Sequence, residues 1–188
     1  LSDKRRTPVM TQKQFEQFIM TSGKDILRFC RMTAWDEDMG NDLYQDVMLR
    51  LSEKRHKLDA AQNIKSYALS MCILLWKNRK RKHAVRMRLA PTGSLDELNE
   101  EGVQSTDMSS HEGPEDILVS REQNETVRRL VASLDEKYRL PLYLHYCADL
   151  KINEIAGVLN IPENTVKSRM HTARTILKKK LEELGYDR

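Results

Sequence analysis

The side chains best suited to chemistry lie near the C-terminus, between residues 151 and 181. At 100° per residue, Val166, Met170 and Ala173 fall on one side of a helix that begins near Glu163, and Leu177 extends the same stripe. The opposite side gathers polar side chains that can donate hydrogen bonds. These are Asn164, Lys167, Ser168, His171, Thr172 and Thr175. Such side chains can bind base edges in the DNA major groove, whereas neighbouring cations contact phosphates.

The segment before this helix predicts how it is positioned. Ile152, Ile155, Ala156 and Leu159 recur at the spacing of a short amphipathic helix. Asn160 tolerates a left-handed turn, and Pro162 suits the start of the next helix. A short helix, a tight turn and a donor-rich second helix together indicate a DNA-reading helix-turn-helix. The plainer alternative is a helical hairpin with a cationic, solvated face.

Composition and charge predict helical modules with polyanionic partners. The chain has 188 residues, 32% of them charged, with only seven Gly and five Pro, which favours helices over a turn-rich β fold. Residues 1–88 carry 19 Lys and Arg against 10 Asp and Glu, and residues 119–188 carry 13 against 10. Residues 89–118 carry eight acids and no base, which indicates an extended acidic linker. Two basic modules around an acidic insert are typical of polyanion binding, although solvated surfaces explain the charge alone.

The N-terminal module reads as successive helices. Apolar residues recur from Phe15 to Cys30, a polar break is expected over 36–41, and Leu43, Val47 and Leu51 mark a short helix. After a charged connection over 53–63, the longest helix is expected from about Ile64 to Arg88, with a strongly basic far end. One face of it carries Ile64, Tyr67, Ala68, Met71 and Leu75.

Other classes of site and compartment find little support. Cys30, Cys72 and Cys147 are odd in number and widely spaced, which favours reduced thiols in a cytosol over a disulfide framework. His145 and Cys147 lie close together, but no second ligand pair has zinc spacing, so ordinary packing is expected. No apolar run is long enough to span a bilayer, and residues 1–8 do not resemble a signal peptide. We therefore expect no cofactor and no metal.

Four motifs in order resemble one family. NEIAGVLNIPENTVKSRMHTAR is similar to region 4.2 of the extracytoplasmic-function (ECF) sigma factors, and LDEKYRLPLYLHYCADL resembles region 4.1. Upstream, NDLYQDVMLRL resembles region 2.2, and KSYALSMCILLWKNRKRK resembles regions 2.3 and 2.4. A helix-turn-helix alone is weak evidence of family, whereas these elements in this order are specific.

The resemblance implies an all-α fold of two small helical domains joined by a flexible acidic linker. Residues 1–88 would dock on core RNA polymerase and recognise and melt the −10 element, and residues 119–188 would read the −35 element through the helix-turn-helix. The linker, residues 89–118, would thread through polymerase, mimicking nucleic acid or merely serving as a tether. The expected function is promoter-specific transcription initiation and its regulation in the bacterial cytoplasm. The expected partners are the two largest catalytic subunits of core polymerase, promoter DNA and an anti-sigma factor, with no membrane insertion and no enzymatic activity.

The resemblance also assigns residues to three roles. For the −35 element the candidates are Asn164, Thr165, Lys167, Ser168, Arg169, His171, Thr172, Arg174 and Lys178. For the −10 element they are Lys65, Trp76, Lys77, Arg79, Lys80 and Arg81. For core polymerase they are Asp42, Leu43, Gln45, Asp46 and Leu49, with the polar groups forming a rim around an apolar contact.

Four positions depart from a simple transfer of roles. Trp76, at the edge of the apolar stripe, suits base stacking and burial equally well, whereas Tyr67 lies on the stripe and is expected to be buried. The family often has Asn near Leu74 and Arg near Thr172. Because Thr cannot make the bidentate guanine contact of Arg, the preferred −35 sequence is expected to differ or to depend on DNA shape.

Two other classes of protein compete with this interpretation. A conventional helix-turn-helix regulator would bind operator DNA, usually a palindrome, without polymerase. A nuclease could hold Mg²⁺ with clustered acids, but no phosphate-binding loop or nucleophile–base set accompanies them. Those acids are Asp36, Glu37, Asp38, Asp42 and Asp46.

Overall fold

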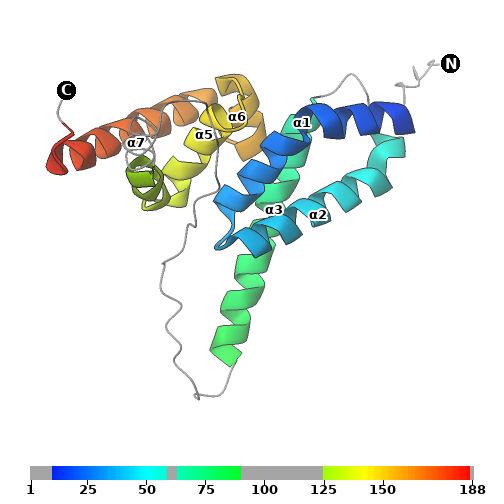
Figure 1. Ribbon diagram of the computed structural model, residues 1–188, viewed down its shortest axis with the longest axis horizontal. Coiled ribbons are helices and arrows are strands. Elements are labelled where there is room, and N and C mark those ends of the chain that lie inside the picture. The colour runs from blue at the N-terminus through cyan, green and yellow to red at the C-terminus, as the bar shows by residue number, and fades with distance from the viewer. Residues whose placement is uncertain (1–9, 59–62, 90–124, 187–188) are drawn as a thin grey trace, which may run out of the picture. The chain divides into compact units, whose positions relative to one another are not determined.

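A computed structural model describes residues 10–58, 63–89 and 125–186, and within these ranges the regular elements are helices, with no strand. The all-α prediction is confirmed. The chain divides into two compact units, drawn in Figure 1. The N-terminal unit is built on α1, α2 and α3, and the C-terminal unit contains α5 and α7. The predicted acidic linker, residues 89–118, lies outside the described residues apart from Leu89.

Helix α1 spans Gln12–Thr33 and begins at a capping box. The Thr11 backbone amide donates to Gln14 Oε1 at 2.8 Å, and the Gln14 amide donates to Thr11 Oγ1 at 3.3 Å. Each side chain thus satisfies an amide that the first helical turn leaves unpaired. Of the apolar residues that the periodicity predicted, Phe15, Phe18, Ile26 and Cys30 are buried along one face, whereas Ile19 and Leu27 are half-buried.

Helix α2 spans Glu37–Lys54, so the expected polar break over 36–41 is wrong. The break is short because Asp36 caps the helix: its carboxylate accepts a hydrogen bond from the Met39 amide at 2.7 Å. Four residues later, Gly40 lets α2 approach α1 closely. A Cβ at Gly40 would lie 2.6 Å from Arg31 Cα, which no side chain tolerates.

Helix α3 spans Ile64–Leu89 and follows the short 3₁₀ helix η1, Arg55–Lys57. The first half of α3 packs on α1 and α2, where Ala68, Leu69 and Cys72 are buried. The C-terminal part of α3 continues past α1 and α2 (Figure 1), and no residue of α3 after Trp76 is buried. The predicted longest helix and its basic far end are therefore confirmed.

The C-terminal unit contains a helical stretch over residues 125–132, then α5, Glu136–Tyr146, and α7, Glu163–Glu183, which packs on α5. Between them α6 spans Ile152–Leu159. The turn after α6 has Asn160 at φ 53°, as its left-handed propensity predicted. The Ile161 amide donates to the Ala156 carbonyl at 3.1 Å, and the Asn160 amide donates to that of Gly157 at 3.3 Å. These bonds satisfy carbonyls at the end of α6 and aim the chain into α7.

Candidate nucleic-acid interface

Helix α7 separates an apolar face from a polar one as the sequence predicts. Val166, Met170 and Ala173 are buried. Of the −35 candidates, six side chains are exposed and three are half-buried. The exposed ones are Asn164, Lys167, Ser168, His171, Arg174 and Lys178, and the half-buried ones are Thr165, Arg169 and Thr172. A short helix, a left-handed turn and a second helix with an exposed donor face form a helix-turn-helix.

Two hydroxyl groups on this face are bonded within α7. Ser168 Oγ donates to the Thr165 carbonyl at 3.1 Å, and Thr175 Oγ1 donates to the His171 carbonyl at 3.1 Å. In this conformation each hydroxyl can still accept a hydrogen bond but has already used its proton. Asn164, Lys167 and His171 are therefore the exposed side chains of this face best able to donate to a base edge.

Arg174 is joined to α5 by an aromatic residue, Tyr146, that was not among the predicted site residues. Its guanidinium donates to the hydroxyl of Tyr146 at 3.0 Å and lies 5.9 Å from the centre of the Tyr146 ring. Tyr146 is 63% exposed, although it lies two residues after the buried run Leu140–Leu144. The signal in the sequence that could have indicated Tyr146 is the position of this aromatic residue, two residues after Leu144, which is buried.

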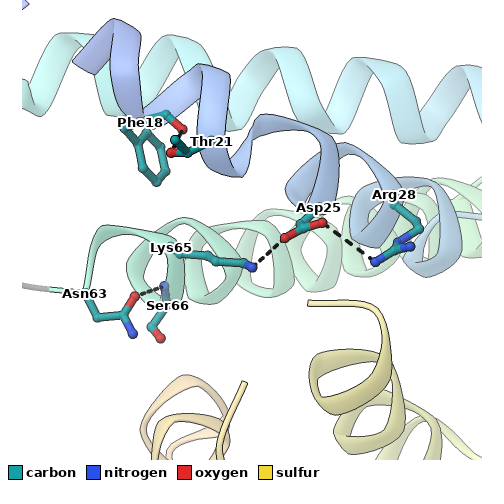
Figure 2. Close-up of polar contacts among 7 residues, drawn as sticks. All are labelled: Phe18, Thr21, Asp25, Arg28, Asn63, Lys65 and Ser66. Atoms are coloured by element: carbon teal, nitrogen blue, oxygen red, sulfur yellow. Dashed lines mark hydrogen bonds and ion pairs between the residues drawn. The ribbon is translucent and has the colours of Figure 1, made fainter. Parts of the chain in front are cut away.

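Helix α3 carries cations over its second half and contains no acidic residue in its 26 residues. Of the −10 candidates, Lys77 and Arg81 are exposed, whereas Lys80 and Arg79 are half-buried. Lys65, at the other end of the helix, is held by α1: its ammonium lies 2.6 Å from the Asp25 carboxylate, which also faces Arg28 at 3.7 Å (Figure 2). Lys65 can contact DNA only in competition with Asp25.

Trp76 is 3% exposed, so the burial alternative holds and stacking on a DNA base is excluded in this conformation. Its ring packs edge-on against Trp35, with centroids 5.0 Å apart, and Trp35 packs in the same way against His83 at 5.0 Å. Trp35 is 46% exposed and was not predicted as a site residue. The expectation for Tyr67 was wrong in the opposite direction. It is exposed, because the buried stripe of α3 is centred on Ala68 and Cys72 and takes in Leu69 rather than Tyr67.

The candidates for polymerase binding also divide into exposed and buried side chains. Asp42 and Gln45 are exposed, Asp46 is half-buried and Leu49 is 60% exposed. Leu43, by contrast, is fully buried with Val47 and Leu51 in the core of the N-terminal unit. Leu43 therefore supports the surface from within and is corrected from a contact residue to a packing residue.

Buried titratable groups lie in the two cores rather than at these surfaces. Cys30 and Cys72 are buried, and their sulfur atoms are hydrogen-bonded at 3.4 Å. The hydrogen bond to Cys30, together with burial, raises the pKa of Cys72 well above its ordinary value. Burial raises the pKa of Tyr143 to about 12. Within the described ranges, no three His, Cys, Asp or Glu side chains gather as metal ligands, and no helix there has the length and apolarity to cross a membrane.

Comparison with known proteins first identifies the class of the helix-turn-helix. Residues 124–177 match the Sigma-70, region 4 family. The chain is 42% identical over 71 residues to the ECF RNA polymerase sigma factor SigW of Bacillus subtilis, a match spanning 38% of each protein. It is 24% identical to SigX of B. subtilis over 91% of this chain and 85% of SigX. With the ECF RNA polymerase sigma-E factor of Escherichia coli K12, 30% identity covers 52% of this chain and 51% of the relative.

Two solved structures have a fold similar to that of this chain over nearly its whole length. The sigma factor RpoE of Bartonella quintana, solved in complex with the anti-sigma factor NepR, superposes with a TM-score of 0.69 at 18% identity, covering 94% of this chain and 99% of RpoE. CnrH, solved with the cytosolic domain of CnrY, gives 0.64 at 16% identity, covering 92% and 90%. The helix-turn-helix defines a region 4 module of the sigma-70 class. The chain as a whole is similar to ECF sigma factors of that class, and its matches span 38% of SigW and 51% of sigma-E.

Proposed function

We propose that the chain binds core RNA polymerase and directs promoter-specific transcription initiation, reading the −35 element with α7 and opening the −10 element with α3. The observation that carries the proposal is the presence in one chain of two separate helices with exposed cationic or hydrogen-bond-donor side chains. One is α7, whose donor face with Lys167 and His171 points away from a buried core. The other is α3, which has no acid to repel a phosphate backbone.

The proposed division of labour follows the two units. Residues 1–88 would bind polymerase through the α2 surface and hold the −10 strand, residues 89–118 would link the units, and residues 119–188 would bind the −35 element. For polymerase we retain Asp42, Gln45, Asp46 and Leu49. For the −10 strand we retain Lys77, Arg79, Lys80 and Arg81, and Lys65 in competition with Asp25.

The proposed partners are core polymerase and promoter DNA, with the bacterial cytoplasm as the site of action. An anti-sigma factor is a further proposed partner, since the Bartonella RpoE structure contains one. The chain would act as an initiation factor that supplies DNA recognition and no catalysis of its own. Polymerase would carry out the chemistry.

The proposal is tested by run-off transcription on fragments of genomic DNA with purified core polymerase, in the presence and absence of the chain. Transcripts from defined start sites are expected only when both are present. The Lys167→Ala, His171→Ala double variant serves as the control, because it should bind core normally yet fail at these promoters. A chain that binds a palindromic duplex tightly without polymerase and starts no transcripts would instead be a conventional regulator.

A further inference from the structure

Tyr146 and Arg174 place two hydrogen-bond donors from different helices side by side at the surface. Tyr146 is the last residue of α5, and Arg174 lies in the second half of α7. The distance from Arg174 Nη2 to the Tyr146 hydroxyl oxygen is 3.0 Å, and both side chains are exposed. No acidic side chain is hydrogen-bonded or ion-paired with either of them in the described structure, unlike Lys178, which faces Glu182 at 3.6 Å.

The direction of the hydrogen bond decides what this pair can bind. The guanidinium can only donate, so the Tyr146 oxygen accepts and keeps its own proton for another acceptor. Arg174 retains further N–H groups beyond the one given to Tyr146. The pair therefore offers a phenol O–H and guanidinium N–H groups together with one positive charge. Adjacent oxygens of a phosphodiester match this set of donors.

The Tyr146 ring is held in place before any ligand arrives. The His145 ring packs edge-on against it at 4.8 Å, and His145 Nδ1 lies 3.0 Å from the Leu150 carbonyl, which anchors the imidazole to the turn after α5. Contact between the guanidinium and the ring at 5.9 Å adds a cation–π attraction. A phosphate binding here would not have to order two free side chains, which lowers the entropy cost of the contact.

The register of α7 places the pair beside the proposed reading face. Arg174 follows Lys167 by seven residues, which is two turns, so the two lie nearly in line with an axial separation of about 10 Å. The major groove is about 12 Å wide, and residues near the N-terminus of a recognition helix enter it. With Lys167 at the bases, Arg174 stands back at the level of the sugar–phosphate backbone.

We propose that Tyr146 and Arg174 together form a binding site for one DNA phosphate at the edge of the −35 major groove. This inference rests on the proposed function and adds α5 to the DNA-binding surface. In it, Arg174 supplies the charge, while Tyr146 both donates to the phosphate and orients the guanidinium. The other possible ligand of an exposed tyrosine, a surface of polymerase itself, is separated from DNA by the test.

The test titrates holoenzyme, formed from the full chain and core polymerase, with a fluorescent duplex carrying the −35 region of a promoter that it transcribes. Tyr146→Phe removes one hydroxyl and keeps the ring. Tyr138→Phe is the matched control, because it removes a hydroxyl from the same helix, α5, beside another cation, Lys137 at 4.9 Å. Arg174→Gln and the double variant complete a cycle, and each affinity is measured over a range of salt concentrations.

Tyr146→Phe is expected to weaken duplex binding by about 3- to 10-fold, as for the loss of one hydrogen bond, without changing the salt dependence. Arg174→Gln is expected to weaken binding and to lower the salt slope by about 1. The double variant should lose less duplex affinity than the product of the two single-variant losses, because the two groups share one phosphate. Tyr138→Phe should bind as the wild type does.

The proposal is overturned if Tyr146→Phe binds the duplex as tightly as Tyr138→Phe does, or if the two single losses multiply. It is also overturned if Tyr146→Phe loses affinity for core polymerase and not for DNA. A wild-type chain that starts no transcripts with core would refute the proposed function itself. If the wild-type chain starts transcripts normally and Tyr146→Phe binds the duplex as tightly as the wild type does, only the phosphate site is refuted.

Discussion

The Asp46 carboxylate on α2 lies 2.6 Å from the Arg79 guanidinium on α3. Arg79 also donates to the Met39 carbonyl at 3.4 Å, so its side chain reaches across the face of α2. A residue proposed for polymerase binding is thus ion-paired with a residue proposed for the −10 strand. Because both side chains are about one-third to one-half exposed, the pair is screened and should contribute under about 1 kcal/mol to stability.

Asp46→Asn should therefore free Arg79 for DNA. The full chain carrying this change is expected to bind a 12-nucleotide single strand about 2- to 5-fold more tightly than the wild type does, with little loss of stability. Asp42→Asn is the control, since it removes the same charge from an exposed position on α2. Fluorescence anisotropy at low salt measures both, and equal gains for the two variants would mean that the ion pair does not restrain Arg79.

Leu43 and Leu49 on α2 should respond oppositely to truncation. Leu43→Ala is expected to destabilise the N-terminal unit by about 2–5 kcal/mol, because the side chain is fully buried. Leu49→Ala should leave unfolding unchanged and weaken association with core polymerase, since its side chain is exposed. Thermal unfolding and a core-binding assay separate the two, and normal core binding by Leu49→Ala would remove Leu49 from the proposed interface.

Lys167→Ala combined with His171→Ala should abolish transcription that depends on the −35 element while core binding stays intact. Both side chains are exposed on the donor face of α7, so the fold should not change. Lys179→Ala, on the same helix but ion-paired with Glu183 at 4.0 Å, is the matched loss of charge. Promoter activity retained by the double variant would place sequence reading elsewhere.

Gly40→Ala should destabilise the N-terminal unit by about 1–3 kcal/mol, because the added Cβ would lie 2.6 Å from Arg31 Cα and must separate α1 from α2. Gly157→Ala, in α6, is the control at a second helical glycine. Its Cβ would meet no atom within 4 Å, so it should stabilise by about 0.5–1 kcal/mol. Thermal unfolding of both variants tests the close approach, and equal effects would contradict it.

Tyr143 gives the C-terminal unit a defined loss of stability at high pH. Its pKa is raised from 10.0 to about 12 by burial, so the folded state holds the proton more tightly than the unfolded state. The associated stability, up to about 3 kcal/mol, is complete below about pH 10 and is lost as the pH rises toward 12. Denaturant unfolding of wild type and Tyr143→Phe should diverge across this window, and parallel curves would show that Tyr143 ionises freely.

Sequence periodicity predicted much of this fold because burial follows helical spacing. Asn160 and Pro162 marked the turn, and the stripe of Val166, Met170 and Ala173 correctly oriented α7. The start of α2 was misplaced because one capping residue, Asp36, allows a polar segment to be helical. A cluster of acids and glycine reads as a loop unless the cap is recognised.

The site residues that the sequence misassigned depend on contacts between elements. Trp76 and Tyr67 lie on one helix, and the burial of Trp76 involves Trp35, which comes before α2 and 41 residues earlier in the chain. The partners of Lys65 and Arg79 are 40 and 33 residues away in the chain, so no local pattern could reveal either ion pair. The link between Tyr146 and Arg174 is hidden for the same reason.

The central claim is that the chain opens promoters only as part of polymerase. It is tested most directly with promoter DNA carrying 2-aminopurine within the −10 element, whose fluorescence rises when the bases unstack. The fluorescence is expected to rise when core polymerase and the chain are both present, and not with either alone. The claim would be contradicted if core polymerase alone gave a rise of equal size. It would also be contradicted if the free chain bound the closed duplex tightly and specifically but no opening occurred in the presence of core.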